Sequence, residues 1–309
     1  MTARDLVIDV RGLTKIYGTR KVVDNFDLKV PKGSVYGFLG PNGSGKTTTI
    51  RMVCGLLIPN EGSGTCLGWD VITQSENIKM RVGYMTQRFS LWEDMTIREN
   101  LDFVARMYDV PDLKQRVTES LENLGLRARS HQLAGSLSGG WKQRLALAAC
   151  MIHDPELLLL DEPTAGVDPK ARREFWDNIH ELADSGVTIL VSTHYMDEAI
   201  QCDNIAYIAY GKKLIDAPST EIAARVGLYT WRVEGKGLAE ISRELKKNPD
   251  VEQVARFGTA LHISGQDEAA LKAAITPWLD KPGLRWRAQE PGLEEAFIHL
   301  LQDTEDNFQ

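Results

Sequence analysis

GPNGSGKT, residues 40–47, is the stretch of this 309-residue sequence that decides its fold. It matches the pattern G-x-x-x-x-G-K-[ST], which places a glycine-rich loop between a strand and a helix. Both neighbours are predicted, because the apolar run SVYGFLG precedes the loop and apolar residues recur at helical spacing after it. The loop and the residue after it comprise Gly40, Pro41, Asn42, Gly43, Ser44, Gly45, Lys46, Thr47 and Thr48.

This loop has the chemistry of a phosphate-binding site. Its glycines let backbone N–H groups turn inward around phosphate oxygens, and the N-terminus of the following helix adds a partial positive charge. We predict that Lys46 reaches the β- and γ-phosphates of a nucleotide and that the Thr47 hydroxyl is a ligand of Mg²⁺. A glycine-rich turn that binds no phosphate is the alternative, and the flanking strand and helix disfavour it.

Two carboxylates follow a second apolar run, in LLLLDEP (157–163). Asp161 ends the strand predicted there, where a carboxylate at the sheet edge can hold Mg²⁺ or its water shell. Glu162 is next to it and is placed to act as general base on an attacking water. Acidic residues are common at strand ends, so the pair alone is weak evidence. Together with the phosphate loop it predicts a nucleoside triphosphatase.

Two further polar residues close apolar segments. His194 follows VTILVST (187–193), where its ring is placed to donate a hydrogen bond to the γ-phosphate. A structural histidine is the alternative reading at that position. Gln87 closes VGYMTQ in the same manner, and we expect it to contact the metal or the water.

The order of predicted elements indicates an α/β fold with a mixed sheet. Short, wholly apolar strands alternate with helices, which is typical of a parallel sheet covered on both faces. The first thirty residues instead alternate apolar and polar residues, which predicts an antiparallel β subdomain. Residues from about 88 to 152 have a helical pattern and form a predicted helical subdomain. We assign residues 1–220 to this domain.

The pattern restarts after Pro218, and we predict a separate domain over residues 221–309. Its elements follow the order β-α-β-β-α-β, which is the ferredoxin-like arrangement of a small α+β domain. This domain carries more acidic than basic residues, so it does not resemble a basic nucleic-acid-binding domain.

Bulk composition narrows the class of protein. The formal net charge of −7 does not attract the chain to nucleic acid, and we expect no nucleic-acid partner. The start, MTARDLVIDV, lacks the apolar core of a signal peptide, and no run approaches the ~18 apolar residues of a spanning helix, so we expect a soluble chain. Four scattered cysteines predict inert thiols in a reducing compartment: Cys54, Cys66, Cys150 and Cys202.

A second glycine pair stands far from the phosphate loop, in LSGGWKQR (137–144). With it, residues 1 to about 220 resemble the nucleotide-binding subunit of an ABC transporter, whose signature is LSGGQ. The resemblance implies an ABC ATPase that binds ATP and Mg²⁺, paired head to tail with a second copy of itself or with a homologous subunit. Ser138, Gly139 and Gly140 would then close on the nucleotide held by the partner.

The resemblance assigns roles to further residues. Tyr17, in KIYG, matches the aromatic residue that stacks on adenine. Gln87 matches the coupling glutamine, Asp168 in AGVDP lies in the loop that crosses the dimer interface, and His194 matches the switch histidine. Trp141 departs from the family because it replaces the glutamine of the signature, and we expect it to pack without a direct role.

Looser similarities indicate the branch of the family. FSLWEDMTIRENLDFVARMYDV and the ending GLEEAFIHLL resemble ATP-binding subunits of ABC-2 type exporters, the daunorubicin-resistance-like branch of drug efflux. That resemblance implies separate membrane permease subunits as partners and a peripheral place on the cytoplasmic side of the inner membrane. A non-transport ABC ATPase, either an assembly factor or a ribosome-associated protein, is the alternative.

Overall fold

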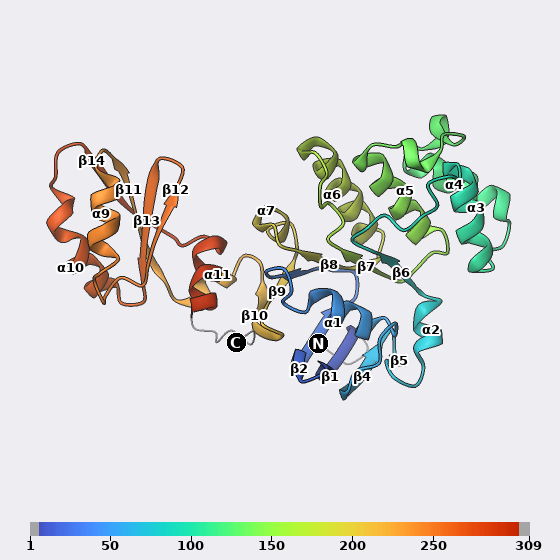
Figure 1. Cartoon of the computed structure of the whole chain (residues 1–309), viewed down its shortest axis with the longest axis horizontal. Coiled ribbons are helices and arrows are strands. Elements are labelled where there is room, and N and C mark those ends of the chain that lie inside the picture. The colour runs from blue at the N-terminus through green and yellow to red at the C-terminus, as the bar shows by residue number, and fades with distance from the viewer. Residues whose placement is uncertain (1–5, 303–309) are drawn as a thin grey trace. The chain divides into compact units, whose positions relative to one another are not determined.

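The computed structural model describes residues 6–302, so the first five residues of the segment tested for a signal peptide lie outside the described residues. The backbone divides into two compact units, Met1–Leu214 and Ile215–Gln309. Figure 1 shows the elements of each unit. Among residues 6–302, no helix is both long enough and apolar enough to cross a membrane.

Two sheets build the first unit. The first sheet has the strand order β2-β1-β4-β5, and its pairs β1–β2, β1–β4 and β4–β5 are antiparallel. The second sheet has six strands in the order β10-β9-β3-β8-β7-β6. The strands are β1 Leu6–Tyr17, β2 Arg20–Pro31, β3 Val35–Leu39, β4 Glu61–Cys66, β5 Trp69–Asp70, β6 Val82–Met85, β7 Leu157–Asp161, β8 Thr188–Thr193, β9 Asn204–Ala209 and β10 Lys212–Pro218.

Helices cover both faces of the six-stranded sheet. α1 packs against β1, β2 and β7, and Figure 1 shows α5 and α6 across the sheet from α1. The helices of this unit are α1 Lys46–Val53, α2 Ser75–Lys79, α3 Ile97–Met107, α4 Leu113–Asn123, α5 Gly139–Met151, α6 Pro169–Asp184 and α7 Met196–Ala199, with short 3₁₀ turns at Arg127–Arg129 and Ala134–Ser136.

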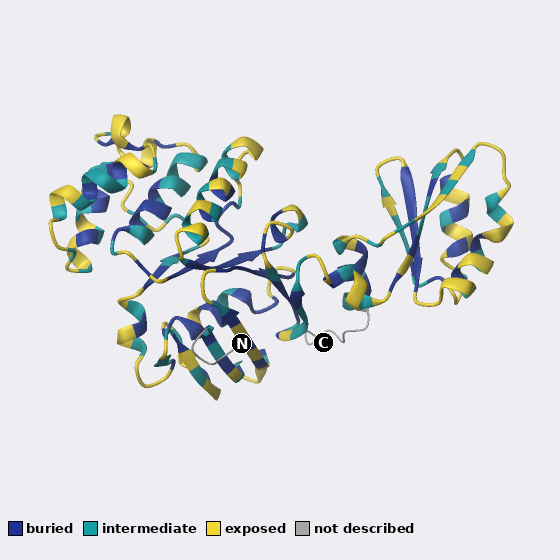
Figure 2. Cartoon of the chain, turned by 180° about the vertical axis from the view of Figure 1, so that it is seen from behind, coloured by how far each residue is buried: buried dark blue, intermediate teal, exposed yellow. Residues whose placement is uncertain are grey.

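The predicted parallel sheet is confirmed at its centre. β3 runs parallel to β8 and β9, and β7 runs parallel to β6 and β8. Every residue of β3, β7 and β8 is buried, as the dark blue strands of Figure 2 show. Continuous burial explains why these strands are mainly apolar and do not alternate with exposed polar residues. Because they are parallel, their carboxyl ends meet at one edge, and the polar residues that follow them gather there.

The predicted helical subdomain is also confirmed. α3, α4 and α5 share a core of their own, to which Leu101, Leu121 and Leu145 contribute fully buried side chains. α3 begins at a capping box, in which Thr96 and Glu99 satisfy each other's backbone N–H groups.

The second unit has the predicted ferredoxin-like topology. Its antiparallel sheet has the order β12-β13-β11-β14, and α9 and α10 cover one face of it. Its elements are α8 Ile222–Val226, β11 Tyr229–Gly235, α9 Leu238–Leu245, β12 Gln253–Phe257, β13 Ala260–Gly265, α10 Glu268–Leu279, β14 Leu284–Gln289 and α11 Leu293–Gln302.

Candidate functional site

The phosphate loop leaves β3 and ends at α1, as its motif predicts. Gly45 precedes the helix with φ 104°, a left-handed conformation that side chains rarely adopt. A Cβ atom there would approach the carbonyl oxygen of Val22 to 2.8 Å, and one at Gly40 would lie 2.0 Å from the carbonyl oxygen of Ile208. The glycines are therefore required for the loop to fit between its neighbours.

Lys46 is buried at the start of α1. Its Nζ donates to the carbonyl oxygens of Gly40 and Pro41 at 2.8 and 3.1 Å and lies 3.4 Å from Oε1 of Glu162. Burial lowers the pKa of Lys46, while the carboxylates of Glu162 and Asp161 act in the opposite direction. The ammonium group is held inside the loop that we expect to bind phosphate.

Asp161 and Thr47 meet across the site, as the metal prediction requires. Thr47 Oγ1 donates to Oδ1 of Asp161 at 3.0 Å. The same carboxylate oxygen accepts from Ser192 Oγ on the neighbouring strand at 2.7 Å. Asp161 is almost completely buried, so these two hydroxyls fix its orientation.

Glu162 stands at the centre of the predicted catalytic residues. Its Oε2 accepts from Nε2 of Gln87 at 3.0 Å and lies 3.3 Å from Nδ1 of His194. Its backbone adopts φ 48°, which is rare for a residue other than glycine. The backbone N–H of Glu162 donates to the carbonyl and hydroxyl oxygens of Ser192, and these bonds hold that conformation.

One cavity joins most of these residues. Glu162 and Gln87 line it together with the phosphate loop and α1. The hydroxyl oxygen of Ser44, within the loop, is buried and has no hydrogen-bond partner in the described residues, which suits a site for an oxygen-rich ligand. The lining residues are Val22, Asn42, Gly43, Gly45, Lys46, Thr47, Thr48, Gln87 and Glu162.

Other predicted residues lie apart from this cavity. Tyr17 is half exposed at the end of β1, where Nζ of Lys15 stands 5.5 Å from its ring centroid. Ser138 and Gly139 are exposed at the start of α5, and Asp168 is exposed at the start of α6. None of these residues lines the cavity that contains Lys46. Tyr17 can therefore contact a nucleotide there only through its base, and Ser138, Gly139 and Asp168 only from a second subunit.

The signature loop and the AGVDP loop meet where two helices begin. Ser138 is the N-cap residue of α5, and Asp168 caps α6 by accepting from the backbone N–H groups of Lys170 and Ala171. A Cβ atom on Gly140 would lie 2.7 Å from Cβ of Ala171. Only a glycine lets the two helix N-termini approach this closely.

Trp141 packs within the helical subdomain, as we expected. Its ring centroid lies 4.6 Å from the guanidinium carbon of Arg129 and 5.3 Å from that of Arg144. The indole also packs against the apolar core of the helical subdomain. Its contacts are those of a structural side chain.

Two residues of the site were not predicted from the sequence. Ser192 and Glu198 are both buried, and each holds polar groups beside Glu162 or His194. The available signal for Ser192 was a hydroxyl inside an otherwise apolar strand. Glu198 gave no signal, because it lies in the polar segment HYMDEA, which is typical of an exposed helix.

Comparison with known proteins agrees with this geometry. The family model described as "ABC transporter" matches residues 23–165. The chain is 37% identical over 274 residues to the daunorubicin/doxorubicin resistance ATP-binding protein DrrA of Streptomyces peucetius, covering 87% of this chain and 80% of DrrA. The chain belongs to the ABC transporter family. Within that family it is an ATP-binding subunit.

Other ABC transporter proteins extend the comparison. The chain is 40% identical over 226 residues to a probable multidrug ABC transporter ATP-binding protein, YbhF, of Escherichia coli K12. That match covers 72% of this chain but only 39% of YbhF, so the chain spans about two fifths of that relative. A solved ATP-binding subunit of an ABC transporter matches with TM-score 0.65 and 26% identity, over 72% of this chain and 93% of its own.

Proposed function

We propose that this ABC subunit hydrolyses ATP at Glu162 and thereby powers export of a substrate through a separate membrane permease. The contacts of Glu162 carry the proposal. One buried carboxylate meets the buried lysine of the phosphate loop, the exposed Gln87 and the partly buried His194. No other described carboxylate combines a place in the nucleotide cavity with all three partners.

The reaction converts ATP and water into ADP and inorganic phosphate. Oε of Glu162 accepts a proton as the water attacks the γ-phosphorus, and the bond to the β-γ bridging oxygen breaks. The ammonium of Lys46 neutralises negative charge on the β- and γ-phosphates. The ring of His194 donates a hydrogen bond to the γ-phosphate, and Gln87 orients the water together with Glu162.

The residues present fit a divalent cation. A hydroxyl, a carboxylate and an amide oxygen are the ligands that Mg²⁺ prefers, and they come from Thr47, Asp161 and Gln87. A cation held by these residues would supply positive charge to offset the negative charge that develops during hydrolysis. The bond from Thr47 to Asp161 already directs both groups toward one another.

A second subunit completes the site in this proposal. Ser138, Gly139 and Gly140 of the partner close on the γ-phosphate, and the exposure of Ser138 and Gly139 at the N-terminus of α5 supports that role. Asp168, exposed at the start of α6, contributes to the interface between the subunits. Tyr17 stacks on adenine with its exposed ring. The partner is a second copy of this chain or a homologous ATP-binding subunit.

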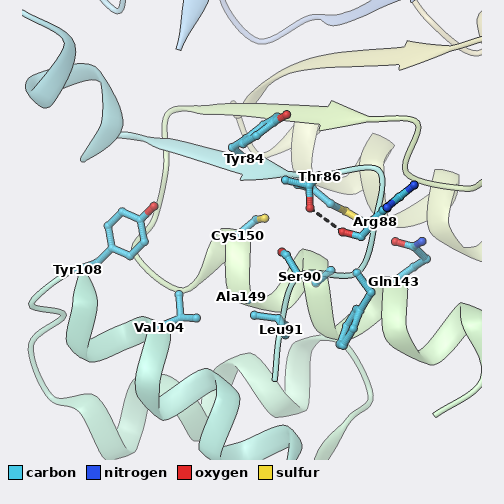
Figure 3. A pocket seen from close by; sticks show the side chains of 13 residues that line it. Tyr84, Thr86, Arg88, Ser90, Leu91, Val104, Tyr108, Gln143, Ala149 and Cys150 are labelled. Carbon is cyan, nitrogen blue, oxygen red and sulfur yellow. Dashed lines mark hydrogen bonds between the residues drawn. The ribbon is translucent and has the colours of Figure 1, made fainter. Parts of the chain in front are cut away.

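A groove beside Gln87 is the place that we assign to the permease. Figure 3 shows it between the end of β6 with its following loop and the helices α3 and α5. The loop is shaped by the hydroxyl of Thr86, which donates to the carbonyl oxygen of Arg88 at 2.7 Å. Aromatic and aliphatic side chains line the rest, which suits an amphipathic helix of a partner. Among the lining residues are Phe89, Leu91, Val104 and Tyr108.

Residues 1–220 form the ATP-binding domain, and residues 221–309 form an accessory domain. The structure describes residues 6–302 of these two domains. The permease is of the ABC-2 type, and the chain works on the cytoplasmic side of the inner membrane. The accessory domain braces the two subunits during opening. Deleting residues 221–309 with no change in dimerisation or turnover would contradict that last role.

Co-purification from membranes tests the proposal. The Glu162→Gln protein is trapped with ATP, and the proteins that copurify from detergent-solubilised membranes are identified by mass spectrometry. We expect a multi-spanning membrane protein in near-equal amount. Recovery of soluble partners alone, with the chain absent from membranes, would replace the exporter with a soluble assembly ATPase.

A further inference from the structure

Glu198 is a buried carboxylate, 1% exposed, that no step of ATP hydrolysis described above uses. Three groups from different segments converge on it. Thr193 Oγ1 donates to its Oε2 at 2.6 Å, Thr164 Oγ1 donates to its Oε1, and Nε of Arg172 lies 3.4 Å from that same Oε1. A carboxylate so completely buried is stable only because these partners satisfy it.

The first arm of this cluster leads to His194. Thr193, at the end of β8, uses its hydroxyl twice: it donates to Glu198 and accepts from the backbone N–H of Tyr195 at 3.0 Å. These two bonds define the turn on which His194 stands, between Thr193 and Tyr195. Nδ1 of His194 in turn lies 3.3 Å from Glu162. Rotation of the Thr193 hydroxyl would therefore release the turn that presents the histidine.

The second arm leads to the loop after Glu162, and the third to α6, whose N-cap residue is Asp168. Thr164 lies two residues beyond Glu162, so its bond to Glu198 ties that loop to α7. Arg172 is in the first turn of α6, and its backbone N–H donates to the carbonyl oxygen of Asp168 at 2.9 Å. A displacement of the start of α6 is thus transmitted to the Glu198 carboxylate.

We propose that Glu198 is a positioning residue that sets the separation of Glu162 and His194 and makes it depend on the helix starting at Asp168. The inference rests on the proposed roles of Glu162 and His194. Glu198 does not line the nucleotide cavity, so its loss leaves the phosphate-binding groups in place. The effect of disrupting the cluster falls on turnover rather than on nucleotide binding.

Substitutions at the two ends of β8 test this. Thr193→Val removes the hydroxyl that joins Glu198 to the turn of His194, and we expect kcat to fall by about tenfold with KM for ATP within about twofold of wild type. Thr193→Ser restores the hydroxyl and should recover most of the lost kcat. Thr188→Val is the matched control, because Thr188 is equally buried and accepts from the backbone N–H of Gly33 at 3.0 Å, at the far end of the strand.

The measurements separate positioning from stability. Thermal unfolding gives Tm for each variant, and steady-state phosphate release gives kcat and KM. If Thr188→Val lowers Tm as much as Thr193→Val but keeps kcat, the loss at Thr193 is specific to the site. If both variants lose kcat in proportion to Tm, or if Thr193→Val keeps kcat, the inference is overturned.

A double-mutant cycle with His194→Ala identifies the route. We expect Thr193→Val to cause no further loss of kcat in the His194→Ala protein, because the turn then carries no catalytic ring. Losses that multiply would contradict action through His194. Failure of this inference and failure of the proposed function give different results. If Glu162→Gln retains hydrolysis, the base role of Glu162 fails. If the kcat losses of Thr193→Val and His194→Ala multiply, the positioning role of Glu198 fails.

Discussion

Nζ of Lys46 lies 3.4 Å from Oε1 of Glu162, so the residue expected to bind phosphate and the residue expected to activate water are in contact. Both side chains are buried, and the contact therefore takes place largely out of water. The opposite charges stabilise one another where each alone would be costly. Substitution at either position changes the surroundings of the other.

Replacing Glu162 with Gln keeps the shape of the side chain and removes its basicity. We expect kcat to fall by a factor on the order of 10² to 10⁴, because proton transfer to a positioned base supplies acceleration of that size. ATP binding should persist and the ATP-bound dimer should accumulate. Phosphate release and light scattering measure the two effects. Turnover above a tenth of the wild-type rate would remove Glu162 from the base role.

Lys46→Ala tests the phosphate loop itself. Charge-assisted hydrogen bonds are worth about 1.5–3 kcal/mol, so ATP affinity should fall at least tenfold. Titration with a fluorescent ATP analogue measures it. Lys79→Ala is the control, because Lys79 on α2 pairs with Glu76 at 2.8 Å and, among residues 6–302, does not line the cavity. Equal affinity in the two variants would show that Lys46 does not hold the phosphates.

Substitutions at Gly139 and Gly140 separate a role in binding the partner's nucleotide from a role in packing two helices. A Cβ atom on Gly139 has its nearest neighbour, the carbonyl oxygen of Gly166, at 3.7 Å, whereas one on Gly140 meets Ala171 at 2.7 Å. We expect Gly140→Ala to lower the free energy of unfolding by about 1–3 kcal/mol and Gly139→Ala to leave it unchanged or higher. Chemical denaturation measures both.

Activity assays then complete that comparison. Gly139→Ala should still lose hydrolysis, because the added methyl group stands on the exposed surface proposed to face the partner's nucleotide. A Gly139→Ala protein with full stability and full turnover would place the signature loop outside the binding site.

Trp141 should matter for stability and little for turnover. Trp141→Gln supplies the residue usual in the family, yet it removes the ring that contacts Arg129 and Arg144 and its packing on the helical subdomain. We expect a loss of about 1–3 kcal/mol in the free energy of unfolding. Trp141→Phe keeps an aromatic face and should lose less. A fall in kcat of tenfold or more, without loss of stability, would instead assign the indole a part in hydrolysis.

The cysteines should be unreactive in the folded chain. Burial raises the pKa of the Cys54 thiol to about 11 and that of Cys150 to about 12, and it raises the thiol pKa of Cys66 and Cys202 as well. At neutral pH almost no thiolate is present to react. We expect the three buried thiols, Cys54, Cys66 and Cys202, not to react with a disulfide reagent until denaturant is added. Cys150 is only partly buried and lines the groove of Figure 3, so its raised pKa alone should slow its reaction. Rapid labelling of the native protein would contradict their inertness.

The same shifts predict a dependence of stability on pH. Above about pH 9 the unfolded chain loses its thiol protons, whereas the folded chain retains them up to higher pH. The folded state then binds more protons, so the free energy of unfolding falls as pH rises through this window. Denaturation curves at pH 8 and pH 10 measure the difference, and replacing the four cysteines with Ala should reduce it.

Much of the fold follows from local sequence. Loop, strand and helix at residues 34–53 are set by glycines and apolar spacing, so no distant information is needed to predict them. The ferredoxin-like order of the second unit follows likewise from strand and helix patterns. For both units the pattern that decides an element lies within that element.

Contacts between segments are what the sequence does not show. Ser192 holds Asp161 across two strands, 31 residues apart along the chain. Their pairing depends on the register of β7 with β8, and nothing local encodes it. Gly140 is understood only beside Ala171, from another helix. Glu198 looks like an exposed acid until its three partners are seen. Residues that act through a neighbour are therefore the ones that a motif search omits.

Gln87 connects the nucleotide cavity to the groove of Figure 3. Its side chain donates to Glu162, and the next two residues in the chain, Arg88 and Phe89, line the groove. A partner bound in the groove would therefore contact the residues that directly follow Gln87. If a partner in the groove changes ATP affinity by some factor, ATP must change the affinity for that partner by the same factor. A short stretch of loop is then enough to make ATP binding and partner binding depend on each other.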